Sequence, residues 1–427
     1  MVHANALETV IVMEKRTAKV ALSFVILMGA VSLFSDMTHE GARSIYGAYL
    51  RLAGVSAATI GFIMGLGELI GYSLRLVTGY FADKKRNYWT LSIIGYAINM
   101  AAIPLISLIS ENGWKWACLL IILERFGKAI RQPSKNTLVS FASAQVGAGK
   151  AFALQEFMDQ IGAFSGPLFL FLILLFRKEN GDLFFNYRIC FAALIIPAFF
   201  TLYFLLKAKH KFPHPENFEI SIEKEQKSKM NSRFVLYMIA ISLFAFGFID
   251  FPIITMHVAK LAIIPDTFLP LLYAGAMLID AISALIFGWM FDKYGMKVLI
   301  ASNLLSAFFA PFVFLSHSAI WIMMGIMLWG IGMGAQETIL KSAVTSLVPK
   351  ENRSTGFGIF ETSFGLCWFA GSWVLGILYD SSIYSMVLFS VVSELLSVPL
   401  LFVITKWPVP RVNSVKTSKT DDVMKPR

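Results

Sequence analysis

Long apolar blocks separated by short polar segments make up most of this chain of 427 residues. A helix needs about 20 mostly apolar residues to cross a lipid bilayer. Twelve blocks reach this length, at residues 19–46, 56–80, 89–110, 114–134, 151–176, 187–207, 233–257, 267–290, 297–316, 319–344, 355–379 and 382–406. The pattern predicts an all-α membrane protein with twelve transmembrane helices.

Polar segments divide this series of blocks into two halves. We expect an N-terminal tail at 1–17, a first six-helix bundle at 18–207 and a linker at 208–232, which is charged and contains proline. A second six-helix bundle at 233–406 and a C-terminal tail at 407–427 complete the chain.

Composition and charge support a membrane protein and indicate its orientation. Charged residues make up only 15% of the chain, against about a quarter in soluble proteins. Most of the 37 lysines and arginines fall in the tails, the linker and the loops on the same side. Since basic loops stay in the cytoplasm, we expect both termini there, in a plasma membrane such as the bacterial inner membrane. The net charge of +10 then reflects topology, and we expect no nucleic-acid partner.

Residues of the types used in catalysis and metal binding are sparse. The three cysteines are isolated, and the six histidines show no metal-ligand spacing. We therefore expect no enzyme activity, no metal and no cofactor. A sensor is a further alternative, but the linker is too short for a signalling domain.

A short motif occurs once in each half, after its second apolar block. It comprises Gly79, Asp83 and Lys84 in the first half, and Gly288, Asp292 and Lys293 in the second. Its sequence and position resemble the cytoplasmic loop motif of the major facilitator superfamily (MFS) of secondary transporters. The resemblance implies that these six residues latch one conformation, the aspartate facing a helix N-terminus of the other half. The first copy departs from the family pattern, because Arg86 and Asn87 replace a glycine and a basic residue.

Membership of this superfamily implies the MFS fold, with two pseudo-symmetric six-helix bundles. It also implies a transporter that opens a site between the halves to one side of the membrane at a time. Its partners would be the lipid bilayer, a small-molecule substrate and protons as the coupling ion. The fold can work as a monomer.

Charged residues inside the apolar blocks are the candidate functional residues, because burying a charge in a bilayer costs at least a few kcal/mol. In the first block they follow a helical spacing that places them on one face, with Asp36 in the outer half of that helix. The candidates for the proton and substrate pathway are Asp36, Glu40, Arg43, Glu124, Arg125, Lys128 and Asp159.

A second set lies nearer the cytoplasmic ends of the helices. We expect Lys128 or Arg131 to bond Glu156, and Lys341 to bond Glu361, when the cavity closes inward. The candidates for this cytoplasmic gate are Arg131, Glu156, Glu337, Lys341 and Glu361. For Arg131 and Lys341 the alternative is that the side chain only extends to the membrane surface.

Two further resemblances concern substrate and direction. Gly162, Gly166 and Pro167 match the core of a helix-packing motif of drug:proton antiporters, and Ser35-Asp36-Met37 resembles an acidic segment of multidrug antiporters. They imply proton-coupled export of small organic or drug-like molecules. The alternative is an uptake carrier for an organic or phosphorylated anion, because Arg125 and Lys128 would also suit an anion.

Overall fold

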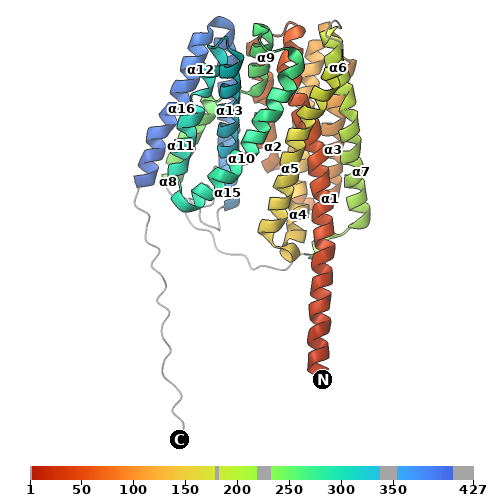
Figure 1. The fold of residues 1–427 in the computed structure, drawn as a ribbon. Coiled ribbons are helices and arrows are strands. Elements are labelled where there is room, and N and C mark those ends of the chain that lie inside the picture. Colours follow the sequence, from red (N-terminus) through yellow and green to blue (C-terminus); the bar gives the residue numbers. More distant parts are fainter. Residues whose placement is uncertain (1, 178–181, 219–231, 337–352, 407–427) are drawn as a thin grey trace.

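The computed structural model describes residues 2–177, 182–218, 232–336 and 353–406, and every regular element there is helical (Figure 1). The first half contains α1 (Val2–Leu52), α2 (Ala57–Lys85), α3 (Tyr88–Leu105), α4 (Trp114–Val146), α5 (Ala148–Leu175), α6 (Leu183–Ala193) and α7 (Ile195–Lys211). The second contains α8 (Ser232–Gly247), α9 (Phe251–Leu261), α10 (Leu269–Tyr294), α11 (Lys297–Ser306), α12 (Phe309–Phe314), α13 (Ala319–Ala335), α15 (Arg353–Ser381) and α16 (Ile383–Lys406). Short 3₁₀ turns are η1 (Ile106–Leu108), η2 (Glu111–Gly113), η3 (Pro215–Phe218) and η4 (Asp266–Phe268).

Each of the twelve expected spans corresponds to a helix or to a pair of consecutive helices. In the described residues, ten stretches are long and apolar enough to cross a membrane, and α13 is a shorter apolar helix. The remaining span, α4, is long enough but carries several charged residues along its length. The all-helical membrane fold predicted from the sequence is confirmed.

Proline explains why three spans are divided into two helices. A proline has no N–H for the carbonyl four residues earlier, and its ring clashes with that carbonyl. Counting back four residues from Pro197, Pro252 and Pro311 leads to the three breaks, between α6 and α7, α8 and α9, and α11 and α12. Pro167, expected to be able to bend its helix, lies inside the continuous helix α5.

The break between α8 and α9 leaves backbone groups without helical partners in the membrane, where each one must be satisfied. Trp329 of α13 donates its indole N–H to the carbonyl of Ile249, with N and O 2.9 Å apart. Asp250 occupies the N-cap position of α9, but its side chain makes no capping bond and is free to contact other helices. The break therefore places a carboxylate at mid-membrane.

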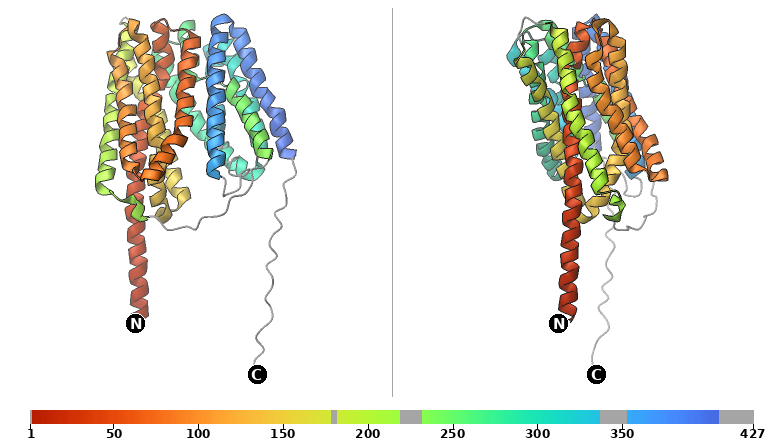
Figure 2. Two further views of the ribbon diagram at one scale, coloured as in Figure 1. Left: turned by 180° about the vertical axis from the view of Figure 1, so that it is seen from behind. Right: turned by 90° about the vertical axis from the view of Figure 1, so that its right-hand side faces the viewer.

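The two halves lie side by side and are close together at only one end (Figure 2). The start of α1 and the end of α16 lie at the other end, which we call the termini end (Figure 1). Most of the contact between the described parts of the two halves comes from three helix pairs: α2 with α15, α5 with α10, and α1 with α9.

At the end opposite the termini, which we call the closed end, the halves meet backbone to backbone. A methyl group added to any of four glycines would collide with backbone of the other half; these are Gly47, Gly61, Gly65 and Gly376. Asp380, at the end of α15, accepts hydrogen bonds from the backbone N–H groups of Ala57 (3.1 Å) and Ala58 (2.8 Å). One half thus caps the first turn of a helix of the other.

The first helix is longer than expected. The sequence placed its end at residue 46, whereas the membrane span covers Ala18–Leu52. Residues 47–50 are helical and buried, so they belong to the span. Asp36 consequently lies at the middle of the span, and its expected position in the outer half was wrong.

The two loop motifs end their helices with positive backbone φ angles. In the second copy Gly295 has a φ of 62°. In the first copy Arg86 has a φ of 52°, which costs a residue with a side chain about 1–2 kcal/mol. The sequence departure at Arg86 therefore carries a conformational cost. The side chains of Asp83 and Asp292 lie outside the described residues, so the latch stays a prediction.

A substitution of Gly166 tests the packing of α1 on α5. A methyl group at this position would collide with the carbonyl of Met37, so we expect Gly166→Ala to destabilise the protein by about 1–3 kcal/mol. The control is Gly275→Ala in α10, where the added methyl meets no atom within 4 Å. That change should be neutral or slightly stabilising. Thermal unfolding of purified protein measures both, and equal effects would contradict the packing argument.

A substitution of Asp380 tests whether its N-cap holds the two halves together at the closed end. Loss of an N-cap costs about 1 kcal/mol, so Asp380→Ala should raise the population with separated ends about fivefold. The readout is the distance between spin labels at Glu111 and His317, which lie on opposite halves. Asp182→Ala is the matched control, because Asp182 caps α6 within one half, accepting from Phe184 N at 3.0 Å. Equal populations in both variants would refute the role of Asp380.

Candidate functional site

A cavity of about 260 Å³ lies between the two halves. Its walls come from α1, α2, α4 and α5 of the first half and from α10, α13 and α15 of the second, together with Gln336. Charged side chains from seven acids and six bases line it: Asp36, Glu40, Arg43, Glu68, Arg75, Arg125, Lys128, Arg131, Lys135, Glu156, Asp159, Asp280 and Glu361. Of the expected pathway residues, only Glu124 is not part of the lining. Glu337 and Lys341 lie outside the described residues.

The two walls differ in chemistry. Most of the charged residues belong to the first half, on α1, α2, α4 and α5. The second half contributes large apolar side chains: Met277, Met333, Phe360, Phe364 and Trp368. A molecule in this cavity would face charge on one side and aromatic rings and thioethers on the other.

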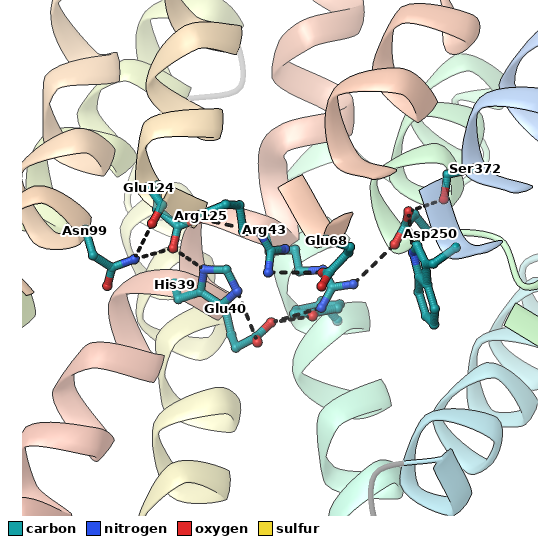
Figure 3. A network of polar contacts seen from close by, with 11 residues as sticks. His39, Glu40, Arg43, Glu68, Asn99, Glu124, Arg125, Asp250 and Ser372 are labelled. Carbon is teal, nitrogen blue, oxygen red and sulfur yellow. Dashed lines mark hydrogen bonds and ion pairs between the residues drawn. The ribbon is translucent and has the colours of Figure 1, made fainter. Parts of the chain in front are cut away.

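Glu124 is fully buried behind the charged wall (Figure 3). It accepts a hydrogen bond from the side-chain amide of Asn99. Its Oε1 atom lies 2.9 Å from Nδ1 of His39, an ion-pair distance whose angles are not those of a hydrogen bond. Arg125 lies 3.5 Å from the other oxygen of Glu124 and 3.0 Å from Glu68. Glu124 thus supports the cavity wall from behind.

His39 connects this buried group to the cavity. Its imidazole is fully buried, and its Nε2 atom lies 3.6 Å from Oε1 of Glu40, which lines the cavity. One ring therefore lies between the carboxylates of Glu40 and Glu124. Histidine can hold or release a proton near neutral pH, which makes it suited to moving a proton between two acids.

Two interactions, which we call the links, join Glu40 and Arg43 to the second half (Figure 3). Tyr273 of α10 donates its hydroxyl to Glu40. Arg43 lies 3.4 Å from Asp250 at the break between α8 and α9, and 3.9 Å from Glu40. Asp250 also accepts from Ser372 Oγ (2.7 Å) and Trp368 Nε1 (3.0 Å). A change of charge on Glu40 would act on both links at once.

Asp36 lines the cavity one helical turn closer to the termini end. It makes no hydrogen bond or ion pair with another described residue. The charges that act on its carboxyl are those of Asp159, Lys128, Arg131 and Lys135. Asp159 itself lies 3.6 Å from Lys135. Asp36 is therefore an acid open to the cavity and surrounded by charge.

The expected gate residues take other partners in this structure. Arg131 donates to Ser35 Oγ (3.0 Å) and lies over the ring of Tyr96. Glu156 lines the cavity and has no ion pair with a described residue. Glu361 lies 3.9 Å from Arg75 of α2, an ion pair across the halves that the sequence did not predict. The pairing of Glu156 with a base belongs to an inward-closed state and stays a prediction.

Sequence reasoning missed His39, Asn99, Tyr273 and Asp380. A histidine next to an acid inside an apolar block was a usable signal for His39. The other three gave none, because their roles depend on which helices meet.

The C-terminal part of the chain, residues 236–426, matches the sequence profile of the Major Facilitator Superfamily. A protein of Mycobacterium tuberculosis (strain ATCC 25618 / H37Rv), named only as uncharacterised, is 33% identical over 404 residues, 93% of this chain and 96% of its own length. An uncharacterised MFS-type transporter of Methanocaldococcus jannaschii is 27% identical over 368 residues, 84% of this chain and 89% of its own. A class H tetracycline resistance protein of Pasteurella multocida is 31% identical over 126 residues, 29% of this chain and 31% of its own.

Solved structures agree on the fold. The nucleoside transporter NupG superposes with a TM-score of 0.68 at 13% identity, covering 90% of this chain and 98% of its own. A D-xylose-proton symporter gives 0.68 at 13% identity, with 90% and 97% covered. With twelve spans in two halves around a charged central cavity, this chain belongs to the Major Facilitator Superfamily and is a multi-pass membrane transporter.

Proposed function

We propose that this transporter moves small organic molecules out of the cell in exchange for protons. The observation that carries the proposal is the position of His39, Glu40 and Arg43. These residues connect the cavity to both links between the halves, so a proton taken from the cavity changes the bonds that hold one conformation.

The proton first binds to Asp36, whose carboxyl is open to the cavity. A proton passes from there to Glu40, one turn away on the same face of α1. Neutral Glu40 attracts Arg43 less strongly and accepts a weaker hydrogen bond from Tyr273. The hydrogen bond from Tyr273, which joins the two halves, is weakened, and this favours separation at the closed end. His39 shares this proton between Glu40 and Glu124, so the change of charge on Glu40 depends on His39.

The direction of transport and the orientation of the protein in the membrane are supported by separate observations. We place the termini end in the cytoplasm of a plasma membrane, because most lysines and arginines of the chain lie there. The cavity of the present structure then belongs to the inward-facing side. Export is supported by the partial likeness to a tetracycline resistance protein. We take one chain as the working unit.

A reconstituted transporter tests the exchange. Purified protein is placed in liposomes containing a trapped pH dye, and organic cations, neutral drugs and organic anions are screened for substrate-driven proton movement. We expect proton flux with drug-like compounds, reduced about tenfold or more in Asp36→Asn, equivalent to at least ~1.4 kcal/mol on the barrier. Glu111→Gln, an exposed acid of η2, is the control and should leave the flux unchanged. Full flux in Asp36→Asn would refute the assignment of Asp36.

His39 should be required for coupling rather than for substrate binding. A glutamine can fill the place of the imidazole and form hydrogen bonds, but it cannot carry a proton. We expect His39→Gln to bind substrate and to exchange labelled substrate across the membrane at equal pH. Accumulation driven by a pH gradient should fall about tenfold. Loss of both activities together would indicate a structural role and contradict the relay.

The uptake of an organic anion is the second candidate function, and one observation favours it. Lys128 lines the cavity and has no ion-pair partner among the described residues. An anionic substrate could provide that partner. If so, Lys128→Glu should reduce transport of organic anions about tenfold or more and affect neutral or cationic compounds less. Equal loss for all classes would remove the support for an anion.

A further inference from the structure

A second group of buried polar residues lies in the C-terminal half and is not part of the cavity. Its centre is Glu394, fully buried in the middle of α16. Ser390, one turn earlier on α16, and Ser306, at the end of α11, are also fully buried, and their hydroxyls face the Glu394 carboxyl. In the structure, both Glu394 oxygens and both hydroxyl oxygens lack a completed hydrogen bond. Two carboxyl oxygens and two hydroxyl groups, each able to donate one hydrogen bond, therefore lie together.

Among the described residues, no charged group balances Glu394. The described charged residues on the helices packed against α16, and on α16 itself, are Arg233, Lys297, Glu361, Asp380 and Lys406, and none of them acts on the Glu394 carboxyl. Lys406 is roughly 18 Å away along the helix, at 1.5 Å per residue. An isolated carboxylate at this depth in a bilayer is unfavourable, so one positive charge must accompany it.

A proton fits this site better than a metal ion. Hard cations such as Ca²⁺ take six to eight oxygen ligands, whereas four oxygens converge here. The nearby amide of Asn303 is already used, since it donates to Ser397 Oγ at 2.8 Å. A protonated carboxyl needs only a hydroxyl to donate to and a hydroxyl to accept from, and Ser306 and Ser390 offer both.

We propose that Glu394, Ser306 and Ser390 form a proton-binding site inside the C-terminal half, with one proton held on the Glu394 carboxyl and shared with the two hydroxyls. The site lies next to the break that carries Asp250. A methyl group on Gly247, the last residue of α8, would be 2.8 Å from the Ser390 carbonyl and 3.2 Å from the Glu394 backbone nitrogen. Loss of the proton would draw water into this packing, three residues before Asp250. The inference does not depend on the proposed direction or substrate.

Thermal unfolding across pH tests the site. The folded protein needs the proton and the unfolded chain does not, so the Tm of the wild type should fall as pH rises. Glu394→Gln keeps the shape of the neutral acid and cannot ionise, so its Tm should fall less over the same range. Glu111→Gln, which removes an exposed acid, should follow the wild type. Parallel curves for wild type and Glu394→Gln would overturn the proposal.

Two further measurements distinguish a bound proton from a metal ion and cover the case in which Glu394→Gln does not fold. The pH series is repeated in sodium and in choline chloride; a rise in Tm specific to sodium, absent in Glu394→Gln, would replace the proton with a metal ion and overturn the assignment. If Glu394→Gln does not fold, infrared spectra of wild-type protein carrying ¹³C-labelled glutamate give the answer. The band of a protonated glutamic acid should persist at pH values where exposed glutamates are ionised, and its absence would refute the site.

Discussion

The structure depends on one constraint: a charge inside a bilayer must have a partner or face a cavity that water can enter. The first half meets this constraint with a continuous group of contacts running from Asn99 through Glu124 and His39 to Glu40. The same group reaches the second half through Tyr273 and Asp250. The partners that make these charges tolerable therefore also join the two halves. A proton that changes one charge changes the contact between the halves.

The two ends of the molecule are held by different forces. At the closed end, glycines allow backbones to touch, and Asp380 caps a helix of the other half. This contact is short-ranged and is lost once the helices separate slightly. Toward the termini end, the ion pair of Arg75 with Glu361 reaches across at longer distance. Close packing at one end and charges at the other suit a protein that alternates between two conformations.

Much of the fold could be predicted from the sequence, because hydropathy alone determines which segments enter a bilayer. All twelve spans were placed. The helix breaks could not have been found from proline alone: each lies four residues before a proline, but Pro133, Pro167 and Pro399 lie inside continuous helices. The position of Asp36 was wrong because the first block was ended at residue 46, whereas the span continues to Leu52. Most pathway candidates do line one cavity, since intramembrane charges converge where water or partners exist. Their partners could not be predicted. Tyr273, Asp380 and Glu394 acquire roles only from the helices that pack against them.

The most direct test of the central claim is to follow both ends of the transporter while its charge state changes. Spin labels at Glu111 and His317 report the closed end, and labels at Asn87 and Tyr294 report the termini end. We predict that lowering the pH lengthens the first distance and shortens the second. We also predict that His39→Gln loses most of this change in distance with pH. Distances that do not change with pH, or a full response in His39→Gln, would contradict the claim that protons act through this network.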